Sequence, residues 1–381
     1  MVNTITYTPI LKCRAAERTA LGGLTDNQKD RVIPLFEFIR PPELTEKDKQ
    51  DAVERGKKIV SPEDRLINIQ SKSFPNEIAL NWNDGRLFYV DFSLLYPKDV
   101  QLEFSKLFCD NAMKLYLNFT PVINLSADED DYFNFMINLS KEHTDSRICI
   151  RIANSEIIKI DTLNHNLNKL INGYEYSKQN ISLLVDLKNN IEIEAYKAAV
   201  KNIQEIEDVC DFKDVILAGG AFPEDMTRYK LDESYGSQDR DDWINWNASI
   251  SKTLIRIPSY SDYAIRHPKH NESLVRLSPS TTIKYTLLDN WRIFRGKKDK
   301  YIYYLANASL LREQDEFKMF GINFSAGNKY IDEKGKYFPE YMDKKNSGKP
   351  AKGTGNNTDW LCAGINHHIA VVVDQLARLH D

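Results

Sequence analysis

The stretch ISLLVDLKNNIEIEAYKAAVKNIQEIEDVCDFKDVILA, residues 181–218, contains the repeating unit that decides the fold. Its two ends, 181–187 and 214–218, are short apolar runs rich in branched residues, which is the pattern of buried strands. Between them, 191–206 places isoleucine and alanine at helical spacing. A strand, a helix and a second strand in this order predict one unit of a parallel sheet that is covered by helices.

The same alternation continues in both directions along the chain. Strands are predicted at 5–11, 32–38, 87–92, 120–125, 147–152, 181–187, 214–218 and 253–257. Helical patterns occur at 14–31, 99–113, 128–141, 161–172 and 191–206. Eight such strands in about 260 residues predict an α/β protein with a (β/α)8 TIM-like barrel. A doubly wound open sheet is the alternative, but no G-x-G-x-x-G follows the first strand, so its dinucleotide-binding form lacks support.

Three segments interrupt the alternation. Residues 39–86 are long and charged, and we expect an inserted helical excursion after the second strand. Residues 281–305 read as an additional antiparallel β ribbon with a turn at Asp289–Asn290, and the Gly-, Lys- and Asn-rich segment 342–358 predicts a mobile loop.

The predicted domain organisation follows from these patterns. The barrel occupies 1–260, including the insertion at 39–86, and an apolar helix at 363–380 closes it. The C-terminal extension, 261–362, contains the ribbon and the loop.

Composition favours a soluble, cytoplasmic protein. Apolar residues make up 42% and charged residues 28%, the longest apolar runs are far too short for a membrane span, and the N-terminus lacks the features of a signal peptide. Five scattered cysteines without a C-x-x-C pair predict reduced thiols and no zinc site of the usual spacing.

The distribution of charge is uneven. The net charge of −4 argues against a general nucleic-acid coat, yet 252–300 contains eleven Lys or Arg and four Asp or Glu, interleaved with aromatic residues. Such a segment can bind phosphates and stack on bases. The alternative, which we favour, is a solvated hairpin whose aromatic side chains pack inward.

Polar residues gather where the predicted strands end. In a parallel barrel all strand C-termini lie on one face, so these residues converge on one mouth. They are Lys12, Arg14, Glu37, Asp91, Asn124, Arg151, Asp186, Gly219, Gly220, Arg256 and Ser259.

This set of residues suits two kinds of chemistry. The carboxylates of Glu37, Asp91 and Asp186 could hold Mg²⁺ or another divalent cation, or act as catalytic acids and bases. The cations, Lys12, Arg14, Arg151 and Arg256, could grip phosphate or carboxylate groups. Together they would suit metal-assisted cleavage of a phosphodiester. The alternative is that they neutralise one another in buried salt bridges.

Two further segments carry candidate residues. The pair Gly219–Gly220 could present backbone N–H groups to an anion or simply allow a tight turn. After the eighth predicted strand, IPSYSDYAIRHPKH (257–270) contributes Tyr260 and Arg266 as candidate ligand-binding residues and His267 as a candidate general acid or base. A single histidine is more often a hydrogen-bonded structural residue.

Several segments together resemble a known family. They are YTPILKCRAAERTAL (7–21), IPLFEF (33–38), ILAGGAFP (216–223), RIPSYSDYAIRHP (256–268) and WLCAGINHHIAVVV (360–373). They are similar to the family named "beta protein", which occurs in phages and prokaryotic genomes, often near mobile or defence-related genes. The resemblance implies a phage or prokaryotic context and a role in phage–host conflict, and it supplies no catalytic residues.

Two functions remain open at this point. The first is binding of a nucleic acid, a nucleotide or a phage component, including another protein of a defence system, at the C-terminal face of the barrel. The second is a metal-dependent phosphodiesterase that uses the strand-end carboxylates. We favour binding, because the chain contains no recognised catalytic motif such as H-E-x-x-H or G-x-S-x-G.

Overall fold

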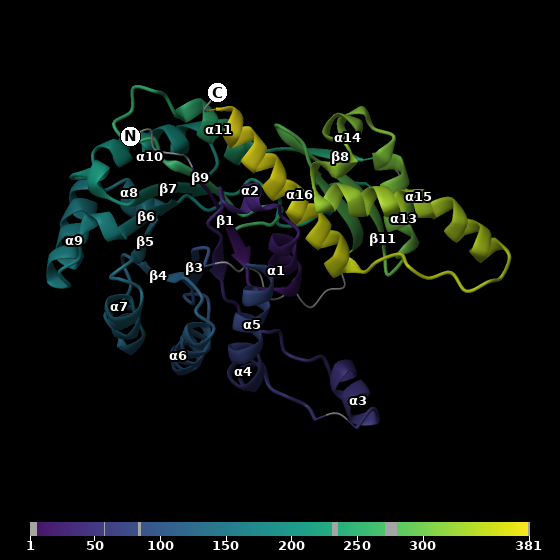
Figure 1. Ribbon diagram of the computed structural model, residues 1–381, viewed down its shortest axis with the longest axis horizontal. Helices are drawn as coiled ribbons and strands as arrows, with labels where there is room; N and C mark the ends of the chain where they lie inside the picture. The colour runs from purple at the N-terminus through teal and green to yellow at the C-terminus, as the bar shows by residue number, and fades with distance from the viewer. Residues whose placement is uncertain (1–5, 57, 83–84, 231–234, 271–279, 380–381) are drawn as a thin grey trace.

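A closed parallel barrel forms the larger part of the molecule. The computed structural model describes residues 6–56, 58–82, 85–230, 235–270 and 280–379 (Figure 1). The barrel consists, in spatial order, of β1 (Tyr7–Lys12), β2 (Leu35–Glu37), β3 (Phe88–Asp91), β4 (Phe119–Asn124), β5 (Ile148–Ala153), β6 (Ile181–Asp186), β7 (Asp214–Gly219) and β9 (Ser259–Asp262). Because β9 pairs with both β7 and β1, the sheet closes, and the predicted barrel is confirmed over the open sheet.

The eighth strand lies later in the chain than the sequence predicted. The apolar run 253–257 forms no strand, and Ile255 within it is 70% exposed. The strand begins after Pro258 and has the sequence SYSD, whose polar side chains are all buried. Ser261, for example, donates from Oγ to the carbonyl oxygen of Thr8 at 2.6 Å. Side-chain hydrogen bonds therefore help to stabilise this strand. Because its sequence is mostly polar, a search for apolar runs does not find it.

Helices cover the outside of the barrel, as predicted. They are α1 (Ala15–Gly22), α2 (Asp26–Lys29), α6 (Lys98–Lys114), α7 (Asp131–His143), α8 (Asn154–Ile157), α9 (Ile160–Gly173), α10 (Ile193–Gln204) and α11 (Asp241–Ser249). Local sequence defines their faces and ends. On α10, Tyr196, Ala199, Val200 and Ile203 form the buried face, and Asp130 caps α7 by accepting a hydrogen bond from the Phe133 amide.

The insertion after β2 is helical, as expected. It contains α3 (Glu46–Glu54), α4 (Pro62–Arg65), a π-helical turn (Leu66–Gln70) and α5 (Ser71–Asn81). Helix α5 packs beside α6 on the barrel, whereas α3 lies apart from it (Figure 1).

A small α/β unit, called the extension from here on, lies beside the barrel and consists of residues 236–239 and 280–378. Its antiparallel sheet has the order β10 (Ser280–Thr286), β11 (Asn290–Lys298), β8 (Gly236–Asp239). Four helices follow: α13 (Ile302–Arg312), α14 (Asp315–Phe320), α15 (Ala326–Asn346) and α16 (Asn357–Arg378). The predicted ribbon is confirmed as β10–β11, although its last residues belong to α13 and β8 was not anticipated. The predicted loop 342–358 is helical at both ends. Helix α15 continues to Asn346, and Asn356 caps α16, which begins at Asn357, six residues before the predicted start at 363.

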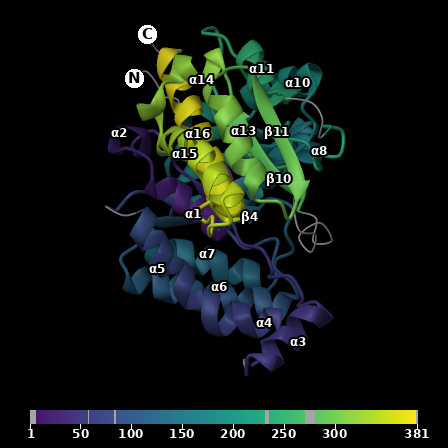
Figure 2. The same ribbon diagram turned by 90° about the vertical axis from the view of Figure 1, so that its right-hand side faces the viewer.

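Helix α16 joins the extension to the barrel. It packs against α1, β10 and α15 (Figure 2). At its centre, Asn366 donates from Nδ2 to the carbonyl oxygen of Ala20 in α1, at 2.9 Å, and accepts from the Gly327 amide of α15, also at 2.9 Å. The side chain of Asn366 therefore connects α16 to both α1 and α15. Within the described ranges, no helix combines the length and apolarity needed to span a bilayer.

The position of the site follows from side-chain alternation. Inward-facing residues in the middle of the strands, such as Ile10, Leu35 and Val122, form an apolar plug inside the barrel. Two residues further along the same strands, the inward positions become polar: Lys12 on β1 and Glu37 on β2. The C-terminal face is therefore charged above an apolar interior.

Candidate functional site

Five of the predicted residues meet in a buried ionic network at the C-terminal face. The guanidinium group of Arg151 lies at its centre. Its Nη1 is 2.8 Å from Oε1 of Glu37 and 2.5 Å from Oδ2 of Asp91. Its Nη2 is 2.6 Å from Oδ2 of Asp186. Lys12 forms an ion pair with Glu37. The barrel geometry thus brings together residues that are up to 174 positions apart in sequence (186 − 12).

Two more residues complete the network. Lys188, two positions beyond the end of β6, places Nζ 3.0 Å from Oδ2 of Asp186. The hydroxyl of Tyr263 accepts a hydrogen bond from Arg151 and donates one to Asp186, each at 2.8 Å. Its place just after a strand is the sequence signal that identifies Lys188 as a candidate.

The network contains three carboxylates and three cations. Burial opposes ionisation of Glu37, yet the charges of Lys12 and Arg151 hold the pKa of that carboxyl well below its usual range. Burial likewise opposes ionisation of Asp186, and Arg151 with Lys188 lowers its pKa to about 2. Glu37 and Asp186 are therefore ionised, and the neighbouring cations neutralise them, as in the salt-bridge alternative.

The arrangement does not suit a divalent cation. Every nitrogen of the Arg151 guanidinium contacts an oxygen of the network, so a positive group occupies the space between the carboxylates. Among the residues that the structure describes, no three His, Cys, Asp or Glu side chains are placed to hold a metal ion.

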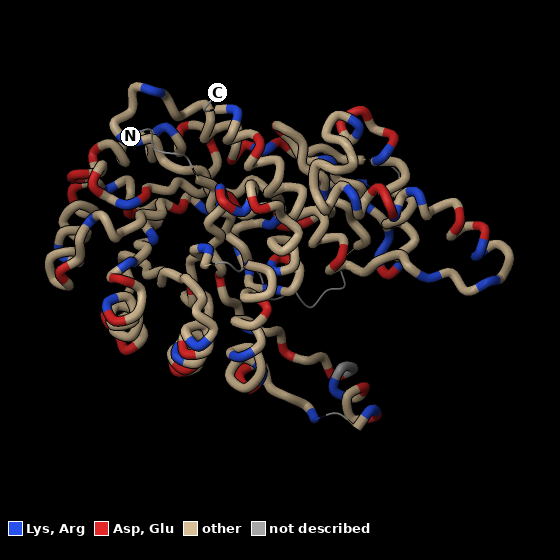
Figure 3. The backbone as a smooth tube through the Cα atoms, viewed as in Figure 1, with Lys and Arg blue, Asp and Glu red and all other residues tan. Residues whose placement is uncertain are grey.

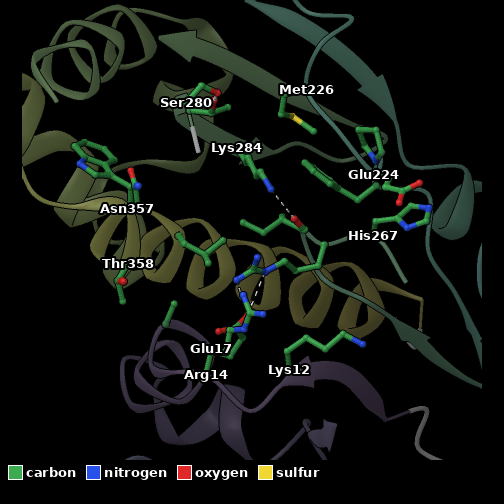
Figure 4. A pocket seen from close by; sticks show the side chains of 18 of the residues that line it. Lys12, Arg14, Glu17, Glu224, Met226, His267, Ser280, Lys284, Asn357 and Thr358 are labelled. Atoms are coloured by element: carbon green, nitrogen blue, oxygen red, sulfur yellow. Dashed lines mark hydrogen bonds and ion pairs between the residues drawn. The ribbon is translucent and has the colours of Figure 1, made fainter. Parts of the chain in front are cut away.

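A cavity of about 500 Å³ lies beside this network, between the barrel and the extension (Figure 4). Lys12, Arg14 and Glu17 line it from β1 and α1, and Arg266 and His267 line it from the segment after β9. The extension contributes Lys284 of β10 and the start of α16. Several residues of the barrel wall were predicted from the sequence, but Lys284 was not.

The cations of the cavity differ in how they are paired. Arg266 places Nη2 2.9 Å from Oε1 of the buried Glu17, and Lys284 donates from Nζ to the carbonyl oxygen of Ile265 at 3.1 Å. Arg14 makes no ion pair or side-chain hydrogen bond with any residue in the described part of the chain. Burial, with the nearby charge of Arg266, lowers the pKa of Arg14. Arg14 is thus a cation without a neutralising contact of its own.

Other predicted residues lie elsewhere or serve packing. Arg256 precedes β9, so it lies at the opposite end of the barrel, and its predicted place at the mouth was wrong. Its guanidinium donates a hydrogen bond to the carbonyl oxygen of Lys213 at 3.1 Å. Tyr260 points outward from β9 and packs edge-on against the stacked rings of Trp243 and Trp246, so it does not face the mouth. His267 does line the cavity, and burial lowers the pKa of its imidazole.

The glycine pair after β7 is explained by close packing. A Cβ at Gly219 would lie 2.0 Å from the hydroxyl oxygen of Tyr196, and one at Gly220 would lie 2.5 Å from the ring of Pro268. Gly220 also donates its N–H to the carbonyl oxygen of Lys188, at 2.8 Å. This amide is therefore already engaged, so the close packing around the two glycines explains them better than anion binding does.

A second buried polar cluster ties α16 to the outside of the barrel. His368 contacts Oδ2 of Asp262 through Nε2 at 2.8 Å and the Thr286 hydroxyl through Nδ1 at 3.1 Å. The hydroxyls of Tyr7 and Tyr260 donate to the same carboxylate, at 2.5 and 3.0 Å. The cluster faces the helical layer, away from the cavity.

Comparison with known proteins gives one match. Neither a curated protein nor a solved structure matches the chain. A family model described as Beta protein matches residues 7–374, from the start of β1 to the last turns of α16. Because this match includes every strand of the barrel and nearly all of the extension, the chain belongs to the Beta protein family.

Proposed function

We propose that the protein binds the phosphate group of a small ligand, such as a nucleotide, in the cavity between the barrel and the extension. The observation that carries this proposal is Arg14, a partly buried guanidinium that lines the cavity and forms no ion pair with any described residue. A buried charge without a partner is costly, so such a site favours a ligand of opposite charge. The planar fork of arginine matches the oxygens of a phosphate.

The surroundings of Arg14 support an anionic ligand. Arg266, Lys284 and Lys12 line the same cavity, and the buried carboxylate among them, Glu17, already pairs with Arg266. Ala15 and Ala16, in the first turn of α1, also line it. That helix has no side-chain cap at its N-terminus, so its positive end adds to the attraction for an anion.

The size of the cavity favours a small molecule over a nucleic-acid strand. Its volume of about 500 Å³ is typical of small-ligand sites. The aromatic residues of the basic segment, including Tyr285, Trp291 and Phe294, are at most 1% exposed and offer no platform for stacking bases. Figure 3 shows basic and acidic residues interspersed over both the barrel and the extension. These features match the inward-packing alternative for the described parts of the basic segment, 252–270 and 280–300.

The hydrolase alternative has less support. Its proposed carboxylates, Glu37, Asp91 and Asp186, contact Arg151 in place of a metal. The family resemblance is the basis for expecting a role in phage–host conflict and a partner from a defence system, and both stay expectations.

Calorimetric titration tests the proposal. We expect inorganic phosphate and adenosine nucleotides to bind the wild type, and we expect Arg14→Gln to weaken binding at least tenfold, about 1.4 kcal/mol. Arg31→Gln, which changes an exposed arginine outside the cavity, is the matched control and should bind normally. Equal affinity of the wild type and Arg14→Gln would overturn the proposal. Tighter binding of a single-stranded oligonucleotide than of any nucleotide would also overturn it, as would metal-dependent cleavage of a model phosphodiester without nucleotide binding.

A further inference from the structure

Lys284 occupies an unusual position in the cavity wall. It lies on β10, where Ile283 and Tyr285 on either side pack into the core of the extension, so Lys284 points the other way, toward the barrel. In Figure 4 its amine extends into the space shared with Arg14 and Glu17. Its side chain is partly reachable from the cavity.

The contacts of this amine are unlike those of a structural lysine. Nζ donates one hydrogen bond, to the carbonyl oxygen of Ile265, and lies 4.3 Å from the ring centroid of Phe222. It forms no ion pair with a carboxylate in the described ranges, because Glu17 is taken by Arg266. A backbone carbonyl and an aromatic ring are partners that a neutral amine can also keep.

The environment favours the neutral form of the amine. Burial lowers the pKa of Lys284 to about 7, the nearby charge of Arg266 adds to this effect, and Glu17 opposes it. Near neutral pH a substantial fraction of the side chain is therefore unprotonated. Desolvation and a neighbouring cation are the two conditions that activate a lysine as a nucleophile toward carbonyl compounds.

We propose that Lys284 forms an imine with the aldehyde or ketone group of a phosphate-bearing ligand whose phosphate is held by Arg14. This inference rests on the proposed function, because the phosphate contact is what places the carbonyl beside Nζ. It narrows the ligand class to small phosphorylated carbonyl compounds.

The reaction balances without an oxidant or a reductant. The lone pair of Nζ attacks the carbonyl carbon, a C–N bond forms, and the carbonyl oxygen becomes a hydroxyl. That oxygen then leaves as water with both protons of the amine, and a C=N bond remains. Solvent water carries these protons from nitrogen to oxygen, because no carboxylate of the described residues forms an ion pair with Nζ.

Reductive trapping of the intact chain tests the inference, with pyridoxal 5′-phosphate as the probe. The protein is mixed with one equivalent of probe, reduced with borohydride, digested and mapped by mass spectrometry. We expect Lys284 to be labelled at least tenfold more than any other lysine. Lys284→Arg should lose this label, whereas Lys298→Arg, an exposed lysine on the adjacent β11, should keep it. Peptide mapping of the wild type gives the answer even if Lys284→Arg does not fold.

Two further comparisons, a probe without phosphate and the Arg14→Gln variant, distinguish failure of this inference from failure of the proposed function. Pyridoxal, which lacks the phosphate, should label Lys284 about tenfold less, and Arg14→Gln should reduce labelling by the phosphorylated probe to a similar extent. Labelling spread over exposed lysines, while inorganic phosphate still binds in calorimetry, would overturn the imine and leave the proposed function intact. Equal labelling of Lys284 by both probes, unaffected by Arg14→Gln, would instead overturn the phosphate site.

Discussion

Replacing Arg151 by methionine tests the balance of charge in the buried network. The wild-type network pairs three cations with three carboxylates, so removing Arg151 leaves one net negative charge in a site where the carboxylates are at most 1% exposed. Breaking a buried ion pair by removing one partner costs about 3–5 kcal/mol. For Asp186, a folded-state pKa of about 2 against about 3.9 in the unfolded chain corresponds to about 2.6 kcal/mol, the same order. Out of a total stability of about 5–15 kcal/mol, this loss is large.

The pH dependence gives a sharper prediction than the loss itself. In the wild type the pKa of Asp186 is lowered by folding, so its stabilisation is present above about pH 4 and is lost as the pH falls toward 2. Without Arg151, at least one buried carboxylate has no cation, and burial raises the pKa of such a group above its unfolded value. The variant should therefore gain stability as the pH falls from 8 to 5, whereas this network gives the wild type no such gain.

Urea unfolding followed by tryptophan fluorescence at pH 8, 7, 6 and 5 measures both effects. Arg147→Met is the matched control, because Arg147 precedes the same strand and contacts Asn118 and a backbone carbonyl instead of a carboxylate. We expect this control to lose about 1 kcal/mol with no new pH dependence. A loss below about 1 kcal/mol for Arg151→Met, or a loss of its stability between pH 8 and 5, would refute the account of the network.

Three further predictions concern packing, the second polar cluster and the thiols. Gly327→Ala should lower stability in urea by about 1–3 kcal/mol, because its Cβ would lie 2.1 Å from a backbone carbonyl oxygen of α16; an unchanged midpoint would contradict this close approach. His368→Ala should cost about 1–3 kcal/mol in the same assay, because Asp262 stays buried and loses a donor; a neutral effect would show that the contact is dispensable. A thiol reagent at pH 8 should react with the exposed Cys210 and spare Cys13, whose pKa burial raises to about 12; rapid modification of Cys13, read by mass spectrometry, would disprove its burial.

The barrel could be predicted because most of its strands are apolar throughout. Runs such as 181–187 and 214–218 are buried on both faces, so their composition alone identifies them. Strands β8 and β9, with the sequences GSQD and SYSD, escaped prediction because hydrogen bonds and tertiary contacts stabilise them. The error in β9 also misplaced Arg256, since a shift past Pro258 moves that arginine to the other end of the barrel.

The candidate site was only partly visible in the sequence. The rule that the strands of a parallel barrel end on one face placed Lys12, Glu37 and Asp186 together, and the structure agrees. The sequence could not show whether Arg151 is available to a ligand or paired with the carboxylates, because that depends on distances between strands far apart in the chain. Lys284 was beyond reach for the same reason, since only the docking of the extension on the barrel turns it toward the cavity.

The bridge made by Asn366 bears on how the chain folds during synthesis. The carbonyl oxygen of Ala20 leaves the ribosome 346 residues ahead of its partner amide, the side chain of Asn366. At about 5–20 residues per second, α1 waits tens of seconds or more before α16 can cover it. Until then the surface of α1 that α16 covers stays exposed on the nascent barrel. We expect a chaperone to protect the unfinished protein at this surface.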